Sequence, residues 1–144
     1  MPASVAVGIL TLLGEEETTT SLVRGIAVID DPDVTVHVLV NGGEEATLAD
    51  VAELPRVHVR SVPENLGVAA GRNRLVDDAA FAAANIVGFL DNDLIVFDDL
   101  FDRLREASAT HDGAAAIGVA LFDHAAFNAA FPNAVSRDAE GGPL

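Results

Sequence analysis

The sequence has no cysteine and no lysine. Without cysteine, the chain can form neither disulfide bonds nor thiolate metal sites. Without lysine, its eight arginines are the only fixed side-chain cations, against 23 aspartates and glutamates. The net charge of −15 argues against nucleic acid as a partner, because phosphate backbones require a basic surface. Four arginines fall in one short stretch, which is the natural place to hold an anionic ligand: Arg56, Arg60, Arg72 and Arg74.

Long apolar runs are also missing. Half of the residues are hydrophobic, yet no run approaches the roughly 20 residues that a membrane-spanning helix needs. The first residues lack the basic flank and cleavage site of a signal peptide and have the pattern of a strand. We therefore expect a cytoplasmic protein with no transmembrane segment. A length of 144 residues allows one compact domain.

Strand patterns alternate with helical patterns along the chain. Five segments have the pattern of buried strands, at residues 5–13, 34–40, 57–62, 86–90 and 114–122. Helices are expected around Leu22, Ile26 and Ile29 with a Thr or Ser N-cap, at 47–54, at 68–84 and from Asp98 or Asp99 to Ala107. This order predicts an α/β domain over residues 1–123, with a mostly parallel sheet of about five strands and helices on both faces. Residues 124–144 are expected to form a poorly ordered tail.

Polar residues follow several of the predicted strands, and ligands of open α/β sheets bind at that edge. Thr11 lies near the first predicted strand, Asn41 follows the second, and Asp91-Asn92-Asp93 ends a short buried strand. Carboxylates suit Mg²⁺ or Mn²⁺, which keep water ligands and bridge to substrate phosphates. The alternative is a solvated turn, which is our interpretation of the second Asp-x-Asp, at residues 31–33.

A second motif runs from Asn65 to Asn73. Gly67 permits a tight entry into a helix, and the small residues at 69–71 allow close approach to other backbone. Arg72 offers planar donors for a phosphate or a base edge. The alternative is a small-residue helix packed on a sheet, with Arg72 as a surface charge. Neither motif is one of the commoner phosphate sites, since the chain has no G-x-x-x-x-G-K-[ST] and no G-x-G-x-x-G after the first strand.

Together, ENLGVAAGRNRLV followed by IVGFLDND resembles the family 2 glycosyltransferases, which have the GT-A fold. The resemblance covers about residues 5–122 and is strongest over 64–93. It implies a Rossmann-like, nucleotide-sugar-binding half of a glycosyltransferase domain, after which residues 124–144 would start a missing acceptor region. The implied reaction is transfer of a sugar from a nucleoside-diphosphate sugar to a hydroxyl of a saccharide, lipid or protein.

The resemblance also implies roles for single residues. Asp91 would contact the ribose, and Asp93, with Asp91 beside it, would hold a divalent Mg or Mn ion on the diphosphate. Arg72 and Asn73 would lie against the nucleotide or position the loop. The remaining nucleotide-sugar-binding positions would be Thr11 near the base, Asn41 after the second strand, and Asn65 and Gly67 of the Asn-x-Gly segment.

The chain departs from the family pattern at the positions expected to contact the nucleotide base. Leu10, Leu12 and Leu13 replace a Pro, an aromatic residue and an Asn around Thr11, and Val40 replaces an Asp that reads the base. These differences leave the identity of the base open. No general base can be assigned, because the chain ends near the point where the acceptor half would begin.

Other functions stay open on the sequence alone. A nucleotidyltransferase would carry a Gly-rich basic loop after the first strand, where this chain has Gly14 and three glutamates. A receiver domain would need a lysine near its last strand. The main alternative is a truncated or degenerate non-catalytic module that binds nucleotide.

Overall fold

The computed structural model describes residues 1–111 and residue 116. This part of the chain contains one sheet of four strands: β1 (Val5–Thr11), β2 (Val34–Asn41), β3 (Val57–Val62) and β4 (Ile86–Asp91). Neighbouring strands are all parallel, in the order β3-β2-β1-β4. The predicted α/β class with a parallel sheet is confirmed; the described residues form four strands of this sheet, where about five were predicted for the chain. The fifth strand predicted at 114–122 lies outside the described residues except for residue 116, which is not in a strand; the tail at 124–144 lies wholly outside them.

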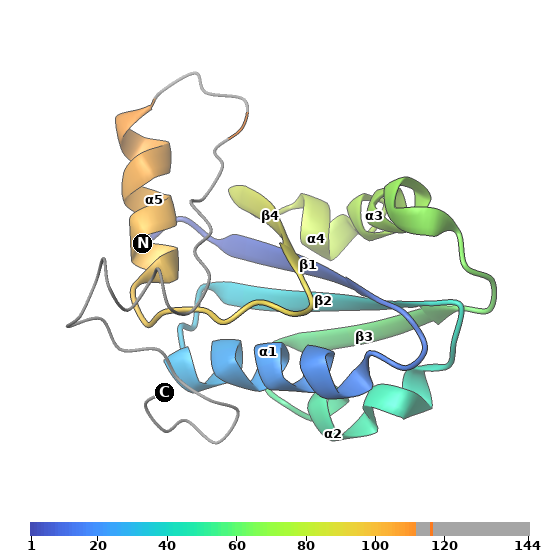
Figure 1. Ribbon diagram of the computed structural model, residues 1–144. Helices are drawn as coiled ribbons and strands as arrows, with labels where there is room; N and C mark the ends of the chain where they lie inside the picture. Colours follow the sequence, from blue (N-terminus) through green and yellow to red (C-terminus); the bar gives the residue numbers. More distant parts are fainter. Residues whose placement is uncertain (112–115, 117–144) are drawn as a thin grey trace, which may run out of the picture.

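Helices cover both faces of the sheet, as predicted (Figure 1). One face carries α1 (Glu16–Ile29). The helix predicted at 47–54 consists of two short pieces, the 3₁₀ turn η1 (Glu45–Leu48) and then α2 (Ala49–Ala52). The other face carries α3 (Gly67–Val76) and α4 (Ala79–Ala82), and α5 (Leu100–Thr110) follows β4. No helix among the described residues has the length and apolarity to cross a membrane.

The larger core lies between the sheet and α1. Val5, Val7 and Ile9 of β1 are buried there, because alternate residues of a strand point to the same face. They belong to one apolar cluster with side chains from most of the other elements, including Leu22, Val23 and Ile26 of α1, Val36 and Val38 of β2, and Phe101 of α5. Ala6 is buried on the opposite face of β1. Burial on both faces explains the uninterrupted apolar run of this central strand.

The opposite face of the sheet is covered by α3 and α4. Leu75 of α3 and Phe81 of α4 are fully buried there. Gly71 of α3 approaches the sheet so closely that an added β-carbon would lie 2.6 Å from Cδ1 of Leu10. Of the small residues predicted to allow close approach, Gly71 thus packs against the sheet, whereas those at 69 and 70 are exposed.

The helix predicted at 68–84 is interrupted. α3 ends at Val76, and α4 begins after Asp78. The Asp78 carboxylate accepts hydrogen bonds from the backbone amides of Ala80 (2.7 Å) and Phe81 (3.3 Å). An aspartate that caps these amides starts a new helix, and this local bond outweighs the helix-forming tendency of the surrounding alanines.

The predicted N-cap of α1 is wrong. The helix begins at Glu16 without a side-chain cap, and the Thr-rich segment lies inside it. The hydroxyls of Thr18 and Thr19 each donate to the carbonyl oxygen of Glu15 at 2.9 Å. At the other end the helix stops after Ile29, where Asp30 adopts a left-handed conformation with φ of 52°.

A two-pronged ion pair ties α5 to the amino-terminal edge of the sheet. Nη1 and Nη2 of Arg105 bind the two oxygens of Asp31 at 2.7 and 3.1 Å, and Nε donates to the carbonyl oxygen of Ala3. The Arg105 guanidinium holds the pKa of the Asp31 carboxyl below its usual value. Asp99 occupies the predicted N-cap position of α5, but its side chain makes no cap hydrogen bond. Its carboxylate binds Arg103 instead.

Candidate functional site

Three strands end side by side at the carboxyl edge of the sheet. Leu10 of β1 is in register with Asp91 of β4, and Thr11 is in register with Val40 of β2. The parallel pairing therefore brings the predicted residues Thr11, Asn41 and Asp91 to the same edge. This is where open α/β sheets bind their ligands.

The sequence motifs meet at Arg72 and Asp91. Nη2 of Arg72, on the second turn of α3, lies 2.9 Å from Oδ1 of Asp91 at the end of β4. The guanidinium also lies over the ring of Phe89, 5.4 Å from its centroid, in a cation–π arrangement. Both side chains of the ion pair are partly exposed. The helix that begins at Gly67 and the carboxylate at the end of β4 are thus adjacent. A nucleotide-sugar site built from both motifs would require this.

Asn41 is buried and shapes the loop that leads into α3. Its Nδ2 donates to Oδ1 of Asn65 at 3.1 Å and to the carbonyl oxygen of Gly67 at 3.4 Å. Its Oδ1 accepts from the backbone amide of Leu66 at 2.8 Å, while Asn65 also accepts from the amide of Gly67. Gly67 itself has a φ of 76°. The side chains of Asn41 and Asn65 are therefore hydrogen-bonded to other protein groups. These hydrogen bonds hold the backbone at the start of the helix that carries Arg72.

Thr11 is also buried, and it belongs to a polar network that no sequence motif indicated. The hydroxyl of Thr19 lies 2.7 Å from that of Thr11. Asn92, the middle residue of the Asp-Asn-Asp motif, donates from Nδ2 to Oε2 of Glu15 at 2.9 Å and to the hydroxyl of Thr19 at 3.3 Å. The backbone amide of Leu12 donates to the same Glu15 oxygen. The network joins the start of α1 to the loop after β4.

Asp93 and Asn73 are exposed. Asp93 forms no hydrogen bond or ion pair with any described residue. Within residues 1–111 and 116, no group of three His, Cys, Asp or Glu residues is arranged to hold a metal ion. A divalent cation at Asp91 and Asp93 would therefore need water and substrate phosphates to complete its oxygen ligands. Mg²⁺ in proteins commonly uses such shared coordination.

The arginine cluster seen in the sequence is dispersed in the structure. Arg72 alone of the four pairs with a residue of the predicted site. The other three pair with different aspartates: Arg56 with Asp30, Arg60 with Asp78 and Arg74 with Asp77. Of these four arginines, one is thus left to meet an anionic ligand at Asp91.

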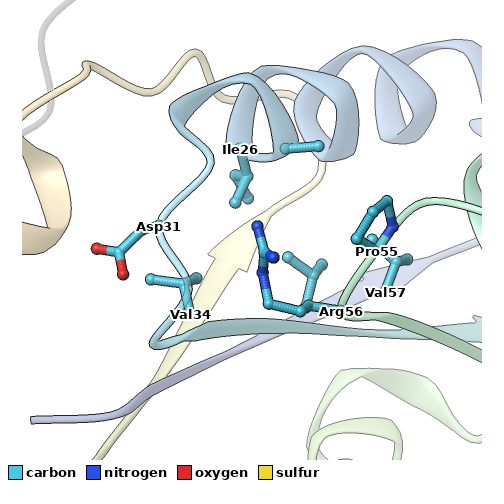
Figure 2. Close-up of a pocket in the computed structure, with 8 residues that line it drawn as sticks. Ile26, Asp31, Val34, Pro55, Arg56 and Val57 are labelled. Carbon is cyan, nitrogen blue, oxygen red and sulfur yellow. The ribbon is translucent and has the colours of Figure 1, made fainter.

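A small, mostly apolar hollow lies elsewhere, between the end of α1 and the beginnings of β2 and β3 (Figure 2). Ile26, Val34 and Val57 contribute its apolar wall, and Asp31 and Arg56 its polar rim. These strand beginnings are at the opposite edge of the sheet from Asp91. The hollow is therefore separate from the candidate site.

His37 of β2 is buried on the α4 face. It lies 4.8 Å from the ring of His58 and 5.4 Å from that of Phe81. Burial lowers the pKa of His37, and the charge of His58 lowers it further. Its Nδ1 has no hydrogen-bond partner among the described residues, and the nearest carboxylate oxygen, of Asp78, is 3.9 Å away. His37 is therefore a neutral core residue.

A parallel sheet covered on both faces by helices, with polar residues at the carboxyl ends of its strands, is the architecture of Rossmann-like α/β proteins. Residues 9–133 match the family described as Glycosyl transferase family 2. The chain belongs to this family of glycosyltransferases, which confirms the resemblance carried by the two sequence motifs. A comparison with curated proteins found no match.

Proposed function

We propose that the chain binds a nucleoside-diphosphate sugar at the carboxyl edge of β1, β2 and β4, and that the sugar passes to an acceptor hydroxyl. The observation that carries the proposal is the contact between Arg72 and Asp91 at 2.9 Å in a chain of this family. It places a guanidinium beside a strand-end carboxylate, so that one edge offers groups for a ribose hydroxyl and for phosphate oxygens.

Each residue has a distinct part in the proposal. Asp91 accepts hydrogen bonds from the ribose, and Asp93, exposed and without a protein partner among the described residues, holds the divalent cation with help from Asp91. Arg72 binds the diphosphate while its stack on Phe89 keeps the guanidinium in place. A cation held there would supply Lewis-acid stabilisation of the negative charge on a departing nucleoside diphosphate.

The strong negative charge of the protein supports a role for a cation. With a net charge of −15, the protein repels an anionic donor. Arg72 also has Asp91 as its partner in the free protein, which reduces the positive charge available to the donor. A divalent cation between the carboxylates and the diphosphate offsets both effects.

A second candidate is a degenerate module that does not transfer sugar, and one departure from the family pattern favours it. Val40, which stands where the family has a base-reading Asp, is 1% exposed and packed in the core. Leu13, in the loop after β1, is largely exposed. An apolar surrounding of this kind cannot read a base through carboxylate hydrogen bonds. Assays of sugar transfer and donor hydrolysis distinguish the two functions, because a binding module would do neither.

Calorimetry with UDP- and GDP-sugars tests the proposed donor site. We expect binding in Mg²⁺ or Mn²⁺ and at least a tenfold loss in EDTA, since each tenfold is about 1.4 kcal/mol and a shared cation contributes several. Asp93→Ala should lose the metal-dependent part and keep a wild-type melting temperature. Asp50→Ala is the matched control, because Asp50 is 85% exposed on α2, across the sheet from α3. Equal donor affinity with and without metal would reject the cation role.

A further inference from the structure

The loop that carries the Asp-Asn-Asp motif is attached to the beginning of α1 by one side chain. Asn92 and Glu15 are 77 residues apart in sequence, yet Nδ2 of Asn92 lies 2.9 Å from Oε2 of Glu15. From this contact we infer that Glu15, acting through Asn92, is a positioning residue that orients Asp91 and Asp93 toward the donor. The inference rests on the proposed function of those two aspartates.

The three residues of the motif differ in burial. Asp91 and Asp93 are exposed, whereas Asn92 between them is partly buried and turned toward α1. After Asp91 the chain has no helix or strand until α5 begins at Leu100. The hydrogen bonds of Asn92 connect the start of this irregular loop to the β1–α1 segment, whereas Val96, further along, packs in the core cluster beside Gly25 of α1.

The two residues that accept hydrogen bonds from Asn92 make further hydrogen bonds within the protein. Oε2 of Glu15 also accepts from the backbone amide of Leu12 at 2.9 Å. The second anchor, Thr19, is fully buried, and its hydroxyl is 2.7 Å from that of Thr11. Movement of Asn92 would thus leave a carboxylate oxygen with one donor fewer and disturb a buried hydroxyl pair.

The chemistry at position 92 favours an amide over a carboxylate. An amide donates to Glu15 and Thr19 without adding charge. An aspartate there would place two carboxylates in direct contact, and the resulting repulsion would move the loop. Exchange of the two groups, with the amide at position 15 and the carboxylate at 92, would restore one donor and one acceptor across the contact.

This exchange gives a direct test. We would compare Asn92→Asp, Glu15→Gln and the double variant Asn92→Asp/Glu15→Gln by metal-dependent donor binding. Asn92→Asp is expected to weaken binding about tenfold or more, and the double variant to recover to within about threefold of wild type, as for directly coupled residues. Asn92→Asp/Glu17→Gln is the matched control, because it has the same net charge but Glu17 is exposed on α1 and is not a hydrogen-bond partner of Asn92.

Amide hydrogen exchange provides a readout that needs no donor. The backbone amide of Leu12, which donates to Glu15 at 2.9 Å, should exchange faster in Asn92→Asp than in wild type, and the double variant should restore its protection while the Glu17 control should not. Unchanged exchange in Asn92→Asp, or equal rescue by Glu15→Gln and Glu17→Gln, would overturn the inference. A wild-type protein that binds no donor but shows this exchange pattern would refute the proposed function and leave the contact between Glu15 and the loop established.

Discussion

The guanidinium of Arg72 and the carboxylate of Asp91 are 2.9 Å apart, and their contact joins α3 to the end of β4. Their side chains are 39% and 66% exposed. An ion pair at this exposure contributes little to stability, roughly 0–1 kcal/mol. Under the proposed function, the role of this pair is to place opposite charges at the carboxyl edge of the sheet.

Replacement of Arg72 should reduce donor binding and leave stability almost unchanged. For Arg72→Ala we expect donor affinity to fall about tenfold to a hundredfold, since hydrogen bonds to charged groups contribute roughly 1.5–3 kcal/mol. Arg72→Lys should recover only part of this, because an ammonium lacks the planar fork. Arg74→Ala is the control, as its side chain is 59% exposed and pairs with Asp77 at the end of the same helix. Calorimetry that gives both variants the same affinity would contradict the assignment.

Asn41→Ala should destabilise the fold. Asn41 is 1% exposed, and its loss leaves the backbone amide of Leu66 without its acceptor. We expect the free energy of unfolding to fall by about 1–3 kcal/mol, the usual cost of an unsatisfied buried polar group. Denaturant titration measures this change. Asn73→Ala, on the exposed surface of α3, should stay within about 0.5 kcal/mol of wild type. Equal stability of the two variants would show that the Asn41 bonds do not hold the loop.

Gly67→Ala isolates the effect of backbone conformation at the start of α3. No atom lies within 4 Å of an added β-carbon, but the φ of 76° disfavours any side chain. We expect a loss of about 1–2 kcal/mol in unfolding free energy. The control is Gly88→Ala in β4, where a β-carbon also meets nothing and φ is not in the left-handed region. Thermal melts should separate the two; a Gly67→Ala protein as stable as Gly88→Ala would argue against strain at this turn.

The ion pair of Asp31 and Arg105 should make stability depend on acid. Arg105 lowers the pKa of Asp31 in the folded protein, so the folded state binds this proton less readily than the unfolded state. The stabilisation is then complete above the unfolded pKa of about 3.9 and is lost as pH falls through the lower folded pKa. Asp31→Asn should cost roughly 2 kcal/mol at pH 7 and show a shallower acid decline. Asp102→Asn, 84% exposed, is the control and should keep the wild-type acid profile.

The sequence predicted the four described strands to within two residues at each end. The apolar runs of these strands have typical strand lengths. Short loops follow Thr11 and Asn41, so the positions at which β1 and β2 end can vary little. The break between α3 and α4 was not predicted, because alanine-rich sequence favours a continuous helix and the capping role of Asp78 is a local hydrogen bond. An aspartate at this position is equally compatible with the exposed side of one longer helix, so the residue types alone do not reveal the cap.

The site was predictable where it depends on strand ends and not where it depends on distant contacts. Parallel pairing brings Asp91 to the same edge as α3, so the meeting with Arg72 followed from the order of elements. The bonds of Asn92 to Glu15 and Thr19 span 77 and 73 residues and follow no periodic pattern. A sequence of one protein carries no signal for such a pair, and the same threonines suggested a helix cap.

The central position of β1 has a consequence for the way the chain acquires its structure. β1 is made first, but its second neighbour, β4, follows about 80 residues later, as the bond between Ser4 and Asn85 illustrates. Pairings between distant segments slow folding, because a long loop must close before they contribute. On the ribosome, β1 therefore keeps one edge unpaired until β4 emerges. The arrival of β4 then pairs this edge of β1 and brings Asn92 close to Glu15.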